Sequence, residues 1–155
     1  MRLEASVHIC RAPQDVWAYL GDVSNVAAWD RGVSRAESSS SAQPGPGFEF
    51  DTFAHPRGKS GDGSWGKMSY RITATDPVRG CTIQLNSTTG NARYFKAAEW
   101  QFRVDPELDG SRVFCAAVFQ LRWRYLLLAP VFLGMKRAIR NDLEQLRAKL
   151  ELGNS

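Results

Sequence analysis

Cysteine and histidine are both scarce in this chain. The three cysteines, Cys10, Cys81 and Cys115, are odd in number, far apart and free of any Cys-x-x-Cys pair. This pattern argues against a disulfide framework and against a metal site built on thiolates. We expect reduced thiols, a cytoplasmic location and no metal or other cofactor. His8 is expected to face outward from its strand or toward a neighbouring loop, and His55 to be a solvated side chain in a loop.

Long hydrophobic runs are absent as well. The first ten residues contain no charged segment followed by an apolar stretch, so we expect no signal peptide. The longest uncharged apolar run, Tyr125 to Met135, is well short of the ~20 residues of a membrane span and includes Pro130. The net charge of +4 comes from bases mostly scattered among acids, which does not favour nucleic-acid binding.

Motifs for common catalytic chemistries are missing. The sequence contains no HExxH, GxSxG, P-loop or GxGxxG pattern. Glu49 and Asp51 alternate with Phe48 and Phe50, and Glu99 shares a strand face with Phe95 and Ala97, opposite Trp100. Since the aromatic faces are expected to be the inner ones, these carboxylates should point outward. The sequence therefore gives no support for a buried pair of acids and identifies no catalytic residue.

Periodicity of two dominates the first two-thirds of the chain. Residues 3–9 alternate apolar and polar, which is typical of a half-buried strand. Ala12-Pro13 ends this strand, and two short helices are expected up to about Trp29, separated at Gly21. Six further strands, joined by short turns, are expected between Val33 and Trp123, and consecutive strands of this kind pair antiparallel.

The last segment of the chain predicts one long amphipathic helix after Pro130, reaching about Leu150. Its apolar stripe, in steps of three and four, consists of Phe132, Met135, Ile139, Leu143, Leu146 and Leu150. The concave face of the antiparallel sheet is the large surface available to cover this stripe. We predict an α+β fold: a seven-stranded, curved antiparallel sheet around the helix. Residues 1–152 are expected to form one domain, with 153–155 as a frayed tail.

One stretch combines cations with apolar residues. Between residues 122 and 140 there are five bases and no acid: Arg122, Arg124, Lys136, Arg137 and Arg140. The simplest interpretation is a strand end and helix face whose charges point to water. The alternative is a transient contact with an anionic membrane surface, which mixed basic and apolar residues suit.

The opening of the sequence resembles that of a known superfamily. The match consists of Val7-His8-Ile9, Ala12-Pro13-Gln14-Asp15-Val16-Trp17, Leu20-Gly21-Asp22 and Trp29, together with the long C-terminal helix. In these features the chain resembles the START-like, Bet v 1-like (SRPBCC) superfamily, and within it the bacterial polyketide cyclase/dehydrase and lipid-transport group. The resemblance implies a helix-grip fold with a cavity between sheet and helix. It says little about activity, because this fold hosts carriers, receptors and enzymes.

These observations favour a binding or carrier protein for a small hydrophobic or lipid-like ligand, acting as a monomer or homodimer. A polyketide cyclase, aromatase or dehydratase is the alternative, and a ligand-free interaction protein at a membrane or macromolecular partner is a third. Tyr70 is the best candidate for a hydrogen bond to ligand. The expected wall of core and cavity side chains comprises Phe50, Met68, Tyr70, Leu85, Trp100, Phe119, Met135 and Ile139.

Overall fold

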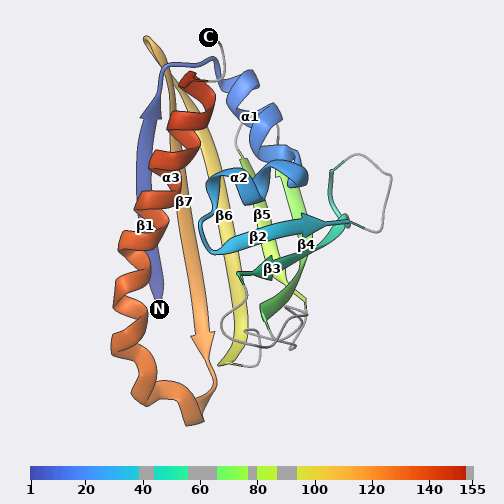
Figure 1. The fold of residues 1–155 in the computed structure, drawn as a ribbon, viewed down its shortest axis with the longest axis vertical. Coiled ribbons are helices and arrows are strands. Elements are labelled where there is room, and N and C mark those ends of the chain that lie inside the picture. The colour runs from blue at the N-terminus through green and yellow to red at the C-terminus, as the bar shows by residue number, and fades with distance from the viewer. Residues whose placement is uncertain (39–43, 56–65, 77–79, 87–93, 153–155) are drawn as a thin grey trace.

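The predicted seven-stranded antiparallel sheet is confirmed in the computed structural model, which describes residues 1–38, 44–55, 66–76, 80–86 and 94–152. The strands follow one another in space in the order β1-β7-β6-β5-β4-β3-β2, and the sheet curves around the helices (Figure 1). The strands are β1 Arg2–Ile9, β2 Val33–Glu37, β3 Glu49–Ala54, β4 Lys67–Asp76, β5 Gly80–Leu85, β6 Phe95–Glu107 and β7 Gly110–Leu121.

Two short helical segments connect β1 to β2, as predicted. The first, α1 (Pro13–Gly21), begins with a proline whose missing N–H costs nothing in the first turn. A 3₁₀ turn, η1 (Val23–Asn25), follows after Asp22, whose side chain accepts the backbone N–H of the second residue of that turn. The single turn of α2 (Val26–Trp29) then brings the chain back over the concave side of the sheet, where it contacts α3 and β2.

The C-terminal region differs from the prediction at its start. Residues expected to be a connection before the helix form a 3₁₀ helix, η4 (Trp123–Gly134), and the α-helix α3 (Met135–Leu152) starts only afterwards. Pro130 has no N–H to donate, which disfavours a continuous α-helix through this segment. The side chain of Phe132 lies outside the described residues, as do residues 153–155.

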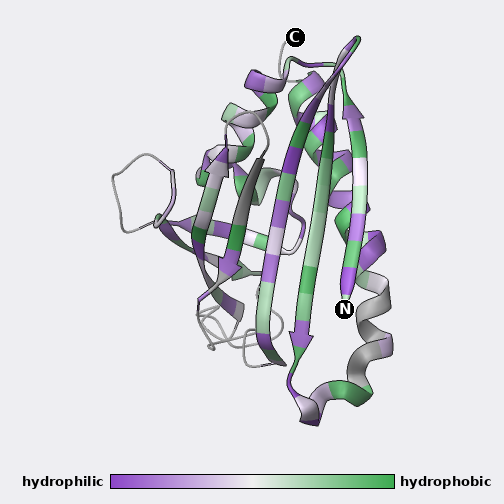
Figure 2. Cartoon of the chain, turned by 180° about the vertical axis from the view of Figure 1, so that it is seen from behind, coloured by the Kyte–Doolittle hydropathy of each residue, from purple (hydrophilic) through white to green (hydrophobic). Residues whose placement is uncertain are grey.

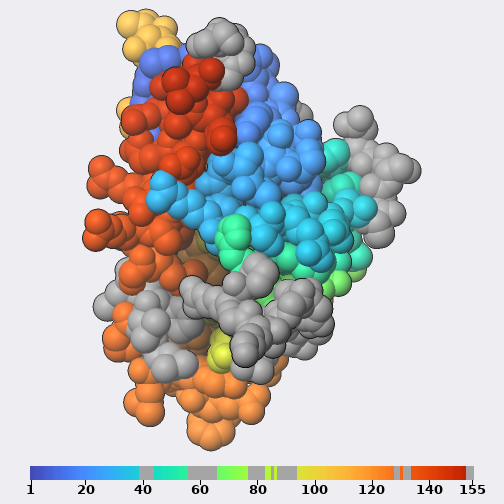
Figure 3. Space-filling view, in the orientation of Figure 1, coloured from blue at the N-terminus to red at the C-terminus, as the bar shows by residue number. Residues whose placement is uncertain are grey.

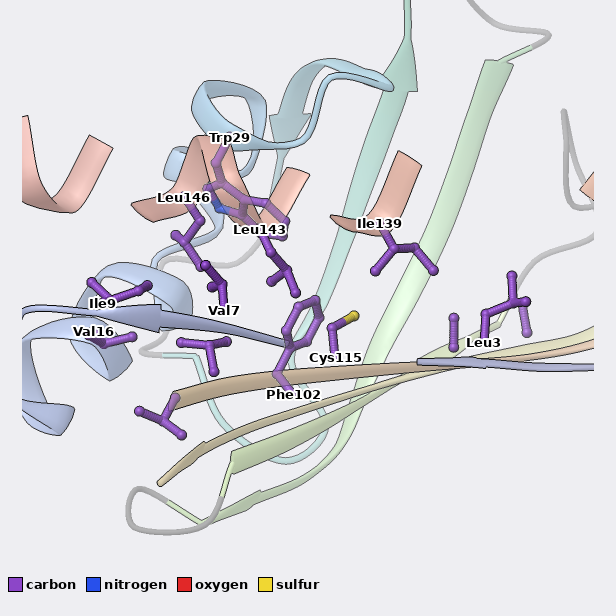
Figure 4. Packing of buried hydrophobic residues seen from close by; sticks show 14 of the residues in the cluster. Leu3, Val7, Ile9, Val16, Trp29, Phe102, Cys115, Ile139, Leu143 and Leu146 are labelled. Atoms are coloured by element: carbon purple, nitrogen blue, oxygen red, sulfur yellow. The ribbon is translucent and has the colours of Figure 1, made fainter. Parts of the chain in front are cut away.

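The core forms where α3 lies along the concave face of the sheet. Ile139, Leu143 and Leu146 are at most 4% exposed, and in Figure 4 they face the sheet, where Phe102 and Cys115 stand. This is the apolar stripe that the sequence predicts, so the closure of the sheet over the terminal helix is confirmed.

A β-bulge corrects one detail of the predicted strand faces. The pairing of β6 with β7 shifts register between Phe95 and Ala97, so the alternation of faces is interrupted there. Phe95 is consequently 6% exposed, and its ring centroid lies 5.1 Å from that of Phe119 in the core. The expectation that Phe95 faces outward with Glu99 was wrong, because period-two counting cannot detect an extra residue.

The convex face of the sheet carries the strand charges. Seen from behind in Figure 2, its strands show polar residues between apolar ones. Lys67 Nζ lies 2.8 Å from an Asp51 carboxylate oxygen, and Arg71 pairs with Glu49. The outward orientation expected for Glu49 and Asp51 is therefore confirmed.

Candidate functional site

A cavity of 180 Å³ lies between the concave face of the sheet, the segment from α1 to α2, and α3. Every layer of the fold contributes to its wall, so the cavity exists only in the assembled structure. Most of the wall is apolar, with six aromatic side chains contributed by helices and strands alike: Trp17, Trp29, Phe50, Tyr70, Trp100 and Phe102. A concave, largely apolar space with few polar groups is typical of a small-molecule site.

Four of the eight side chains expected at a ligand site line this cavity. Phe50 and Tyr70 come from adjacent strands, and their rings stack with centroids 5.5 Å apart. Trp100 contributes from β6 and Ile139 from the first half of α3. The fold thus brings four of the predicted residues, from both halves of the chain, into one cavity wall. That they contact a ligand stays a prediction.

The structure places the other four elsewhere. Phe119 is 2% exposed and belongs to the packed core behind the cavity. Met68 packs beside Tyr70, and the Met68 sulfur atom lies 3.5 Å from the Tyr70 hydroxyl. Met135 packs against the core from the start of α3. The side chain of Leu85 lies outside the described residues. The sequence pattern finds inner-face residues but does not separate wall from core.

Two carboxylates that the sequence interpretation missed line the cavity. Asp30 follows α2 directly, and one of its carboxylate oxygens accepts the backbone N–H of Gly32 at 2.8 Å. Asp142, on α3, accepts the backbone N–H of Arg31 at 3.2 Å. Both acids therefore hold the turn after α2 in place. Among the described residues of the wall there is no lysine, arginine or histidine.

The local environment shifts the proton affinity of these groups. Burial, together with the charge of Asp142, raises the pKa of Asp30 to about 6. Burial also raises the pKa of Asp142. The pKa of Tyr70 lies well above its usual value because its hydroxyl is buried and the Asp30 charge opposes a second anion. At pH 7 the cavity therefore contains a neutral phenol that can donate a hydrogen bond beside a carboxylate that can accept a proton.

Two indole N–H groups are further polar features of the wall, to which Thr52 and Thr75 also contribute. The Nε1 atoms of Trp29 and Trp100 are both buried. That of Trp29 has no hydrogen-bond partner within the part of the chain that the structure describes, whereas that of Trp100 interacts with the Tyr70 side chain. A buried donor without an acceptor costs about 1–3 kcal/mol. Because Trp29 lines the cavity, an acceptor on a bound molecule could recover that cost.

Only one of the two missed acids left a signal in the sequence. Asp142 lies three residues after Ile139 and four before Leu146, on the apolar stripe of the helix. An acid on a buried face is unusual enough to mark a candidate site. Asp30 offers no such signal, since its position in the wall depends on how the turn after α2 folds over the sheet.

A pH-dependent gain in stability is expected for Asp30→Asn. A carboxyl whose pKa is raised on folding holds its proton more tightly in the folded state, so stability falls as pH rises from about 4 through about 6. Removing the charge should raise the free energy of unfolding at pH 7 by about 1–2 kcal/mol. This is less than the free energy that corresponds to the full rise in pKa, because the side chain keeps some contact with water. At pH 4 the difference should nearly vanish.

Urea unfolding at the two pH values measures this effect. Asp15→Asn, which removes an exposed carboxylate from α1, serves as the control and should bring no gain at pH 7. Equal effects of Asp30→Asn at both pH values would show that the pKa of Asp30 is not raised on folding.

The structure describes no group of three or more His, Cys, Asp or Glu side chains arranged to hold a metal ion. Cys10 is exposed and Cys115 is buried. No described helix is both long and apolar enough to span a membrane.

Solved structures similar to this one share its whole fold. The protein TTHA0849 from Thermus thermophilus has a TM-score of 0.76 at 17% identity, with all of both chains covered. The ZhuI aromatase/cyclase from Streptomyces sp. R1128 has a TM-score of 0.74 at 15% identity, covering 97% of this chain and 93% of that one. Norcoclaurine synthase from Thalictrum flavum, in complex with dopamine and hydroxybenzaldehyde, has a TM-score of 0.71 at 12% identity, covering 100% and 88%.

At such low identities the likeness shows a common fold and nothing finer. No curated protein matches the sequence closely enough to add to this. The model of the family described as polyketide cyclase / dehydrase and lipid transport matches residues 1–151, nearly the whole chain. The chain therefore belongs to the polyketide cyclase/dehydrase and lipid-transport family, within the Bet v 1-like SRPBCC superfamily.

Proposed function

We propose that this protein binds a small, largely apolar molecule in the cavity, as a binding or carrier protein, and that the ligand is neutral or cationic. The observation that carries the proposal is the cavity itself: an apolar wall whose charged side chains, among the described residues, are both acids. Family membership supports it, since the family description includes lipid transport.

The volume of the cavity suggests the size of the ligand. An engineered apolar cavity of about 150 Å³ holds benzene, whereas drug-sized ligands occupy roughly 300–1,000 Å³. At 180 Å³ the cavity matches a molecule with one substituted ring, and a longer lipid would place only one end there. The norcoclaurine synthase structure, whose two named ligands each have a single aromatic ring, is in line with this size class.

The charge of the wall suggests the polarity of the ligand. An anionic group placed near Asp30 and Asp142 would be repelled, and the repulsion is strong where water is largely excluded. A protonated amine would be attracted instead. A neutral hydroxyl or carbonyl group could accept a hydrogen bond from the Tyr70 hydroxyl or from the Trp29 indole N–H. Fatty acids with an ionised head group are therefore poor candidates.

Three one-ring probes of similar size test the proposal: 2-phenylethylamine, 2-phenylethanol and 3-phenylpropionate. In NMR titrations at pH 7.5, the cation and the alcohol are expected to bind at least ~10-fold more tightly than the anion, a difference of ~1.4 kcal/mol. Combining Asp30→Asn with Asp142→Asn should remove most of this preference. Saturable binding should also shift resonances of Trp100 and Ile139.

The matched control removes two acids from the convex face, with Glu49→Gln and Asp105→Asn. It removes the same number of negative charges and should leave the order of the three probes unchanged. Absence of saturable binding for all three probes, or tightest binding of the anion in the unmodified protein, would contradict the proposal.

A second candidate function is an enzyme that removes a proton from carbon next to a carbonyl group. The observation that favours it is the pairing, in one apolar cavity, of Asp30, with a pKa of about 6, and Tyr70, which stays neutral. The Asp30 carboxylate would take the proton, and the Tyr70 hydroxyl would donate a hydrogen bond to the carbonyl oxygen as negative charge builds there. Enolates of this kind are intermediates in ring closure and dehydration, which the family description names.

A further inference from the structure

An exposed apolar surface lies at the end of the molecule formed by η4. Trp123 is 84% exposed, Leu126 58% and Leu127 93%. In Figures 1 and 3 this segment, coloured orange, forms the lower end of the molecule, beyond the end of β7 and away from the C-terminus. Large apolar side chains gathered at this exposure are unusual on a monomeric surface and mark an interaction site.

The geometry of η4 explains why these side chains face outward. In a 3₁₀ helix, residues three apart lie above one another, so this segment has three rows of side chains. The row of Arg122 and Tyr125 faces the protein: the two rings of Tyr125 and Tyr94 have centroids 4.9 Å apart, and the Arg122 backbone N–H donates to the Tyr94 carbonyl at 3.1 Å. The other two rows, which contain Trp123 and Leu126 in one and Leu127 in the other, are left to solvent.

Positive charge extends from this apolar tip along the start of α3. Arg124 lies on η4 itself, and Lys136, Arg137 and Arg140 are exposed on the first two turns of α3. None of the four forms a salt bridge with any residue that the structure describes. The stretch from 122 to 140 contains no acid, and the neighbouring Glu4 is already paired with Arg2 at 2.6 Å.

We propose that η4 and the start of α3 form a docking surface for an anionic lipid bilayer. Trp123, Leu126 and Leu127 would enter the interface between head groups and acyl chains, where tryptophan is favoured. The four cations would contact lipid phosphates, as basic residues beside an apolar face do in surface-bound helices. Arg124, whose guanidinium lies 5.3 Å from the centroid of the Tyr125 ring, is exposed and can reach them as well. The proposed contact is peripheral, with side chains of one surface entering the bilayer interface. It does not depend on what the cavity binds.

Co-sedimentation with lipid vesicles tests this surface. Binding to vesicles of phosphatidylcholine with ~30% phosphatidylglycerol is expected, with at least ~10-fold weaker binding to pure phosphatidylcholine. Since each basic residue near an anionic surface contributes about 1 kcal/mol, changing Lys136, Arg137 and Arg140 to Gln should weaken binding on the order of 10²-fold. Changing Trp123, Leu126 and Leu127 to Ser should abolish it, and added salt should weaken the binding of the unmodified protein.

Matched controls separate this surface from general stickiness. Leu108 is fully exposed at the β6–β7 hairpin, and Leu152 is 72% exposed at the end of α3. Changing either to Ser is expected to leave binding unchanged. Tryptophan fluorescence should shift to shorter wavelength with anionic vesicles, and Trp123→Phe should remove that shift. Equal binding to both vesicle types, or no binding to either, would overturn the proposal. So would self-association through this surface in size-exclusion chromatography, lost in the serine variant.

Discussion

Phe119→Ala is expected to lower the free energy of unfolding by about 3–5 kcal/mol, the usual cost of removing a fully buried aromatic ring. Phe119 is 2% exposed on β7, with ring centroids 5.1 Å from Phe95 and 5.6 Å from Trp100. Its removal would leave a void enclosed by sheet and helix that the surrounding backbone cannot fill. Urea unfolding followed by circular dichroism measures the loss.

Trp100→Ala provides the comparison, because Trp100 is only partly buried and one side of it borders the cavity. Fewer packing contacts are lost on that side, so a smaller loss of about 1–3 kcal/mol is expected. The cavity should also grow, and one-ring probes should bind with altered affinity. A loss as large as that of Phe119→Ala, with probe binding unchanged, would show that Trp100 is a core residue and not part of the wall.

The sequence predicts the fold well because periodicity encodes which side of each element is buried. The period-two strands, the two short helices after Ala12-Pro13 and the stripe of Ile139, Leu143 and Leu146 all appear in the structure. Failures occur where a local event breaks the period. The bulge at Phe95 reverses the face of that residue, and the 3₁₀ segment before α3 follows neither the strand period nor the α-helical one.

The candidate site is harder to predict, for a physical reason. Inner-face apolar residues such as Phe50 and Phe119 have the same sequence signal, and only tertiary packing determines that the first borders the cavity while the second is enclosed. The two acids also depend on packing. Asp30 reaches the wall because the turn after α2 folds against α3, where Asp142 binds the backbone of Arg31. No period in the sequence records that contact between residues so far apart along the chain.

A second large effect is expected if the protein is an enzyme, and it concerns Asp30. A bound one-ring ketone such as 1-phenyl-2-propanone should exchange its α-hydrogens with D₂O faster than in buffer, as NMR can measure. Asp30→Asn should slow the catalysed exchange by about 10²–10⁴-fold, the contribution of a positioned general base. Tyr70→Phe should also slow it, since the developing oxyanion loses a hydrogen-bond donor.

The pH profile of this exchange distinguishes a catalytic Asp30 from a structural one. The rate should rise with pH and level off above about 6, as the carboxyl loses its proton. Asp142→Asn removes the neighbouring negative charge that helps to raise the pKa of Asp30, so it should move the rise to lower pH. A loss of stability alone could not produce that displacement. If bound ketone exchanges only at the rate seen in buffer, the enzyme is excluded and the binding protein remains, because the probe titrations do not depend on proton transfer.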